Sequence, residues 1–158
     1  MKKSAIVFLL LLCNFYLFAQ KNISGTVVGI SDGDTFTLLT KDKIKYKIRL
    51  AHIDCPEKNQ AFGTFAKRTL SDLIYLKNVQ VNYSSLDRNG RILGEVYFEK
   101  EFINLILVEK GVAWHFKKYS NDKRFSNAEI RARKNKIGLW KDKNPISPWD
   151  FRKNKIKI

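Results

Sequence analysis

Hydrophobic and polar residues alternate along the first part of the chain with the period of β-strands. Ile23 to Ile30 and Thr35 to Leu39 are rich in β-branched and aromatic residues, and the Asp32-Gly33 pair between them is a hairpin-turn signal. From Ile44 to Leu50 every second residue is hydrophobic, which is typical of a half-buried strand. The pattern therefore predicts three strands joined by tight turns in a meander.

The hydrophobic period then changes to about 3.6, which predicts a helix from about Gln60 to Tyr75. We expect Asn104 to be the N-cap of a short later helix and Gly111 to end it. The remaining elements are predicted as strands over 79–83 and 92–98 and as helices over 104–110 and 122–136, the last ending at Gly138.

Five short strands with inserted and appended helices are typical of an α+β (mainly β) domain. The fold we expect is a five-stranded OB-type barrel with three helices. The basic segment from Pro145 to Ile158 contains two prolines, and we expect it to wrap the surface or fray. The length of 158 residues suits one domain, and 44% hydrophobic with 28% charged residues excludes a disordered or wholly membrane-embedded chain.

The first nineteen residues differ from the rest. Lys2 and Lys3 precede an apolar run from Ala5 to Ala19, which is too short for a spanning helix and ends on a small residue. We therefore expect a signal peptide over 1–19 and a single domain over 20–158, in a secreted or periplasmic protein without stable membrane association after cleavage. An uncleaved N-terminal anchor is the alternative, whereas the bulky Leu12 before Cys13 argues against a lipoprotein.

The chain has a formal net charge of +15. Removal of the predicted signal peptide leaves 28 basic and 15 acidic residues, or +13. A lysine-rich surface could serve solubility alone, but a polyanionic partner such as nucleic acid also fits, and no basic amphipathic helix favours a membrane surface. Cys55 would then be the lone cysteine, so stability must come from the core rather than from an internal disulfide.

Two carboxylates follow predicted strands. Asp34 comes directly after the first hairpin turn, and Asp54 follows the third strand. The Asp32-Gly33 pair could be a turn and nothing more, and the segment from Asp54 to Glu57 could be a proline-fixed turn before a helix. Pro56 could instead fix the backbone so that Asp54, the carbonyl of Cys55 and Glu57 point to one site.

Such a site would suit a hard cation. Ca²⁺ takes 6–8 oxygen ligands, and two carboxylates with one carbonyl supply about three, so water and a substrate phosphate would complete the set. The Cys55 thiolate is a poor ligand for so hard an ion, and this leaves its backbone carbonyl. His52 and His115 have no partner at zinc-ligand spacing, and Phe36 falls where an EF-hand loop needs an oxygen ligand.

Two arginines complete a possible reaction site. Arg49 lies on the polar face of its strand and Arg91 follows the Asn89-Gly90 turn. Either could be a solvated surface group. Near a metal, however, two guanidinium groups could bind the equatorial oxygens of a phosphorane in a bidentate manner.

These residues fall into an ordered set of motifs that resembles the staphylococcal-nuclease-like thermonucleases. The resemblance covers about Ile23 to Trp149. Its motifs are Asp32-Gly33-Asp34-Thr35, the segment from Arg49 to Glu57, the segment from Asp87 to Arg91, Gly111-Val112-Ala113-Trp114, Gly138-Leu139-Trp140 and Pro148-Trp149.

The resemblance implies an OB barrel and calcium-dependent hydrolysis of DNA and RNA at the P–O5′ bond, which leaves 3′-phosphate ends. It implies that Glu57 activates or positions the attacking water. Arg49 and Arg91 would stabilise the transition state, with Arg91 also a candidate to assist the leaving group. Asp34 and Asp54 would bind Ca²⁺ through their carboxylates, together with the Cys55 backbone carbonyl.

The sequence departs from the best-known family member near the nucleotide. Cys55 replaces a threonine at a position where only the backbone is needed. Asn89 and Lys117 stand where that member has tyrosines, whereas Tyr119 retains a third aromatic, so base stacking is expected to differ. Tyr119, Lys117 and Arg88 are the candidate substrate contacts.

The sequence thus favours a nuclease that acts on DNA and RNA, with single strands preferred and the protein a monomer. A noncatalytic OB-fold nucleic-acid-binding module is the alternative, although it would have no reason to retain the acids and arginines together. A calcium-dependent surface or adhesion domain would leave the arginines unexplained.

Overall fold

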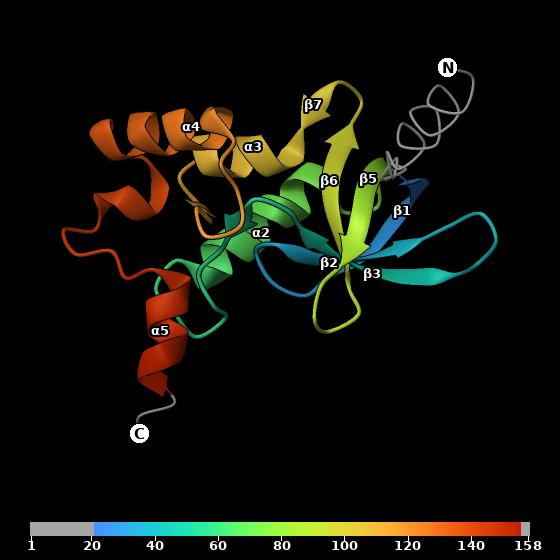
Figure 1. The fold of residues 1–158 in the computed structure, drawn as a ribbon, viewed down its shortest axis with the longest axis horizontal. Coiled ribbons are helices and arrows are strands. Elements are labelled where there is room, and N and C mark those ends of the chain that lie inside the picture. Colours follow the sequence, from blue (N-terminus) through green and yellow to red (C-terminus); the bar gives the residue numbers. More distant parts are fainter. Residues whose placement is uncertain (1–20, 156–158) are drawn as a thin grey trace, which may run out of the picture.

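The structure, a computed structural model, describes residues 21–155, so the predicted signal peptide and Cys13 lie outside the described residues. Six strands form one sheet in the order β3-β2-β1-β5-β6-β7, and an additional pairing of β3 with β6 closes it into a barrel (Figure 1). The strands are β1 (Lys21–Ile30), β2 (Thr35–Leu39), β3 (Lys45–Leu50), β5 (Asn78–Leu86), β6 (Ile92–Phe98) and the short β7 (Glu101–Phe102).

The barrel closes by a parallel pairing that places Ile48 beside Ile92 and Leu50 beside Gly94. The other neighbouring strands of this sheet pair antiparallel. The expected OB-type α+β fold is therefore confirmed, with five main strands in the barrel. A second, two-stranded sheet pairs β4 (Ile53–Asp54) with β8 (Trp114–His115).

The helices gather on one side of the barrel (Figure 1). Helix α2 turns Ala66, Leu70 and Ile74 into the core, and α3 packs between β6 and α4. Within residues 21–155 there is one α-helix more than the three expected. The α-helices are α2 (Gly63–Ile74), α3 (Ile103–Glu109), α4 (Lys123–Lys134) and α5 (Pro148–Lys155), and η2 (Gly138–Lys141) is a 3₁₀ helix.

Helix α5 was not expected, because residues 145–158 were predicted to wrap the surface or fray. Ser147 and Pro148 form an N-terminal helix signal. Ser147 directly precedes the helix, and Pro148 occupies its first position, which suits proline. The Ser147 Oγ donates to Asp150 Oδ2 at 2.5 Å and accepts from the Asp150 N–H at 3.3 Å. The local start signal was therefore present in the sequence.

Asn104 does not cap helix α3, which begins one residue earlier with Phe102 at its N-cap. Its side chain is fully buried. The Oδ1 accepts from the Val96 N–H at 2.9 Å, and the Nδ2 donates to the Ala51 and Gly94 carbonyls at 3.0 Å each. Asn104 thus joins α3 to the end of β3 and to β6.

Gly111 and Gly138 bring two chain segments into close contact. Both have a positive φ, 62° and 58°, and a Cβ on Gly138 would lie 2.2 Å from the Gly111 oxygen. The Leu139 N–H donates to that same oxygen at 2.8 Å. Both positions therefore require glycine, which explains the glycine that begins each of the motifs 111–114 and 138–140.

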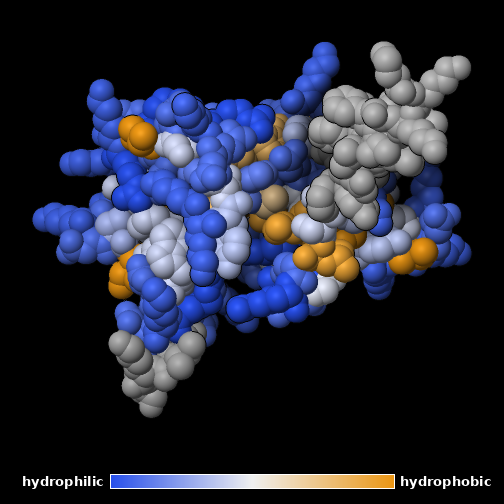
Figure 2. All heavy atoms as spheres, in the orientation of Figure 1, coloured by the Kyte–Doolittle hydropathy of each residue, from blue (hydrophilic) through white to orange (hydrophobic). Residues whose placement is uncertain are grey.

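The core fills the barrel and the interface with α2 and α3. Phe36, Leu38, Ile48 and Val81 are fully buried, and each such side chain contributes roughly 1.5–3 kcal/mol. The outer face in view is largely hydrophilic, with separate hydrophobic patches (Figure 2). Among the described residues, no helix has both the length and the apolar character needed to cross a membrane.

Candidate active site

Asp34 lies at the start of β2 and is buried, with 3% of its surface exposed. The preceding turn is built by Asp32, whose Oδ1 accepts from the Asp34 N–H at 3.1 Å. The Asp34 carboxylate accepts from the Cys55 N–H at 2.8 Å and from the Thr35 hydroxyl at 3.1 Å. A buried carboxylate with these partners is held in a defined orientation.

Asp54 lies on β4 and is 1% exposed. The pairing of β4 with β8 places Asp54 opposite Trp114, which fixes the backbone. The corner before it depends on His52, whose φ is 69° and whose ring nitrogens contact Ser120 Oγ at 3.0 Å and Glu95 Oε1 at 2.9 Å. These contacts hold a backbone conformation that non-glycine residues rarely adopt.

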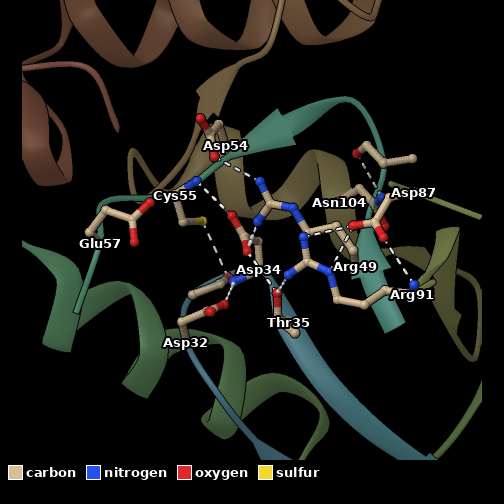
Figure 3. A network of polar contacts seen from close by, with 12 residues as sticks. Asp32, Asp34, Thr35, Arg49, Asp54, Cys55, Glu57, Asp87, Arg91 and Asn104 are labelled. Carbon is tan, nitrogen blue, oxygen red and sulfur yellow. Dashed lines mark hydrogen bonds and ion pairs between the residues drawn. The ribbon is translucent and has the colours of Figure 1, made fainter. Parts of the chain in front are cut away.

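One guanidinium joins the two buried carboxylates. Arg49 contacts Asp34 Oδ1 through Nη1 and Asp54 Oδ1 through Nη2, the latter at 2.7 Å (Figure 3). Because Arg49 is paired with Thr35 across β2 and β3, the barrel itself brings it to the start of β2. Loss of its charge would leave the buried Asp34 carboxylate without its ion-pair partner, which costs about 3–5 kcal/mol in comparable cases.

Cys55 follows Asp54 and is buried and free. Burial raises the pKa of its thiol, and its Sγ lies 3.2 Å from the Gly33 carbonyl as a donor. A neutral, buried thiol is no ligand for a hard cation. Cys55 could therefore offer a cation only its backbone carbonyl oxygen.

The donor set fits Ca²⁺ in type, because Asp34 and Asp54 offer carboxylate oxygens side by side and Cys55 a carbonyl. It does not fill a coordination shell. Within residues 21–155, no group of three or more His, Cys, Asp or Glu residues is arranged to hold a metal ion. A cation here would need water and substrate oxygens to complete its ligand set, as the sequence predicts.

Arg91 reaches the same region from the loop between β5 and β6. Its Nε and Nη2 each contact Asp87 Oδ2 at 2.7 Å, and its Nη1 lies 3.4 Å from Thr35 Oγ1. Partial burial would raise the pKa of Asp87, but the N–H groups of Arg91 and Asn89 outweigh it and lower that pKa. Thr35 thus connects the Arg91 guanidinium to Asp34 (Figure 3).

Glu57 lies beyond Pro56 with its side chain 38% exposed, and its carboxylate contacts a residue that the sequence did not single out. Arg152 of α5 places Nη1 2.6 Å from Glu57 Oε1 and 3.3 Å from Asp54 Oδ1. Its Nη2 lies 2.6 Å from Asp54 Oδ2. Burial opposes the charge of Arg152, but these hydrogen bonds raise its pKa.

Aromatic packing holds α5 in this position. The Trp149 ring stacks on Phe116 with centroids 5.4 Å apart and planes 4° apart, and it meets the edge of Trp114 at 5.5 Å. Trp114 in turn packs on Trp140 at 4.5 Å. Although Pro148-Trp149 is one of the motifs that carry the resemblance, its role in positioning Arg152 follows only from this packing.

The candidate substrate contacts lie outside the acid and arginine cluster. Arg88 is exposed on the turn between Asp87 and Arg91. Tyr119 is 68% exposed and packs on Phe116 at 4.8 Å. The Lys117 ammonium lies 2.9 Å from the buried carboxylate of Glu129. Lys117 is therefore ion-paired within the protein rather than free to contact substrate.

The structure therefore joins five predicted residues, Asp34, Arg49, Asp54, Glu57 and Arg91, through one network that also contains Thr35, Asp87 and Arg152. Neither of two surface hollows, one of them about 1030 Å³ between α2 and residues 135–141, is lined by a predicted site residue. The network pairs hard oxygen donors with groups that bind phosphate, and this combination suits metal-assisted phosphodiester chemistry.

Comparison with known proteins agrees with this chemistry. A family profile described as "Staphylococcal nuclease homologue" matches residues 47–142. A protein of Haemophilus influenzae named "Uncharacterized endonuclease" is 51% identical over 127 residues, which cover 80% of this chain and 71% of that protein. A protein of Shigella flexneri named "Micrococcal nuclease" is 38% identical over 146 residues, covering 85% of this chain and 83% of that protein.

Proposed function

Because the chain belongs to the staphylococcal nuclease family, we propose that it is a calcium-dependent nuclease that hydrolyses phosphodiester bonds of DNA and RNA. The coarser statement, a phosphodiester-hydrolysing nuclease, is supported by relatives that are named nuclease or endonuclease. One observation supports the finer proposal. The Arg49 guanidinium pairs with two buried carboxylates, those of Asp34 and Asp54, in the network that also contains Glu57 and Arg91.

Asp34, Asp54 and the Cys55 carbonyl are the residues that would hold the cation. When bound, calcium would supply Lewis-acid stabilisation of the charge that develops on the phosphate. Arg49 lies between both carboxylates, so its guanidinium is oriented before substrate arrives. Preorganised donors of this kind stabilise a transition state without reorganisation cost.

Glu57 is the residue that activates or positions the attacking water. The partly exposed carboxylate suits this task because it can reach solvent, unlike the two buried carboxylates. The water oxygen would bond to phosphorus as the P–O5′ bond breaks, with one water proton passing to Glu57 and the leaving O5′ taking up a proton from solvent. Arg91 would then donate hydrogen bonds to the phosphoryl or leaving oxygen, and the product would carry a 3′-phosphate.

The protein is further proposed to be secreted or periplasmic and to act as a monomer on single strands in preference to duplexes. The basic start and the short apolar run of residues 1–19 support export. The net charge of +13 for the chain without them supports long-range attraction of nucleic acid.

The test is a timed digestion of single-stranded DNA by residues 20–158, in millimolar calcium and then in excess chelator. We expect cleavage that requires calcium and leaves 3′-phosphate ends, with Asp54→Asn inactive and Asp72→Asn, an exposed acid of α2, unaffected. Salt-sensitive binding without cleavage by the folded protein would instead favour the noncatalytic OB-fold module. Calcium binding without nucleic-acid binding would favour a calcium-dependent surface domain.

A further inference from the structure

Arg152 enters the site from a segment 98 residues away from Asp54 along the chain. Its guanidinium forms two short ion pairs, both at 2.6 Å, one with Asp54 and one with Glu57. A fork of this kind matches two carboxylate oxygens as well as it matches two oxygens of one phosphate. The Arg152 side chain is 40% exposed, so it lies at the boundary between the buried carboxylates and solvent.

The Asp54 carboxylate is shared between two guanidinium groups, those of Arg49 and Arg152. Its Oδ1 accepts from Arg49 at 2.7 Å and from Arg152 at 3.3 Å, and its Oδ2 accepts from Arg152 at 2.6 Å. An ionised carboxylate has about four lone-pair sites, and three hydrogen bonds leave about one. A divalent cation at Asp54 would therefore compete with Arg152, both for oxygen lone pairs and through repulsion of like charges.

Arg152 can leave Asp54 without undocking its helix. The stack of Trp149 on Phe116 and the capped start at Ser147 hold α5 independently of the guanidinium. The long side chain could thus change partner by rotation about its own bonds while its backbone stays in place. An arginine displaced from Asp54 would remain within reach of any phosphate bound beside Glu57.

We propose that Arg152 is a further substrate-binding residue. Its guanidinium pairs with Asp54 and Glu57 in this structure, and it binds a phosphate oxygen of the nucleic acid instead when a divalent cation binds Asp54. This proposal rests on the proposed calcium-dependent nuclease. It makes α5 part of the active site, because Arg152 would contribute a third guanidinium beside those of Arg49 and Arg91.

The proposal predicts effects of opposite sign on two ligands. Arg152→Gln removes a competitor for Asp54, so calcium measured by calorimetry in the absence of nucleotide should bind more tightly, by about tenfold. In saturating calcium, the same variant should bind thymidine 3′-monophosphate about tenfold more weakly, because a bidentate contact with phosphate is lost. The probe contains no phosphodiester bond to cleave.

Lys153→Gln is the matched control, because it removes one positive charge from the same helix. Lys153 is 73% exposed and its ammonium lies 3.6 Å from Asp150 rather than at the site. Both ligands should bind this variant as they bind the parent. Urea unfolding of both variants would check that each is folded.

Calcium affinity that is unchanged in Arg152→Gln, relative to a parent that binds calcium, would overturn the proposal and leave the proposed function intact. Unchanged nucleotide affinity would overturn it too. If both ligands bind more weakly, Arg152 positions the carboxylates and the transfer does not occur. A parent that binds no calcium would refute the calcium site of the proposed function and this proposal together.

Discussion

Asn104 provides the most direct test of how this fold holds its site. We consider Asn104→Ala. The substitution removes the partner of the buried Val96 N–H and of the Ala51 carbonyl, while the Gly94 carbonyl keeps its bond from the Ala51 N–H at 2.9 Å. Each buried polar group left without a partner costs about 1–3 kcal/mol.

Two such groups would cost about 2–6 kcal/mol, and the better helix propensity of alanine returns up to about 0.7 kcal/mol. We therefore expect the free energy of unfolding to fall by about 3 kcal/mol. With an m-value of about 2 kcal/mol per molar urea, the unfolding midpoint should fall by about 1.5 M. Equilibrium urea unfolding followed by tryptophan fluorescence and circular dichroism would measure it.

Asn22→Ala is the control, because Asn22 makes one exposed side-chain bond, to Asn82 at 2.9 Å. Its effect should stay within about 0.5 kcal/mol. A loss of about 1 kcal/mol or less in Asn104→Ala would refute the argument, because it would match the helix cap that the sequence suggested rather than a buried bridge.

Three further predictions concern the site. Arg91→Lys should retain the fold and the charge but lose most turnover, because the planar fork is gone, and a rate within a few-fold of the parent would contradict the role given to Arg91. Glu57→Ser should reduce the rate far more than it reduces calcium affinity measured by calorimetry; a surviving rate would mean that another group positions the water. Because the folded pKa of Asp87 is lowered, its contribution to stability should be complete above the unfolded value of 3.8 and be lost as the pH falls below it. The difference in free energy of unfolding between the parent and Asp87→Asn should therefore shrink over that acid range, and a constant difference would contradict it.

Several elements could be predicted from the sequence because their signals are local. Residues 35–39 and 92–98 have the same bounds as the observed strands β2 and β6. The strand from 45 to 50 differs from the prediction by one residue. In each case the alternation of side chains is a property of consecutive residues, and the buried face follows from it directly.

The acids and arginines of the site were predicted as a set by their motifs, and the structure brings five of them into one network. Their roles in catalysis and calcium binding stay predictions. Lys117 shows the limit of this reasoning, because its place at a family tyrosine position did not reveal that its ammonium contacts the buried Glu129. That partner lies on α4, and only the packing of α4 against α3 and β8 brings the two together.

By itself, the sequence determined the strand pattern through neighbouring residues. Its ordered motifs indicated the OB-type class and the set of acids and arginines that the structure joins in one network. The tertiary structure alone decided that Asn104 bridges β3 and β6 and that Arg152 contacts Asp54 and Glu57. The contacts of Arg152 join residues 95 and 98 positions apart. No local pattern encodes such pairs, because they exist only once the chain has folded and the aromatic stack has docked α5 against Trp114 and Phe116.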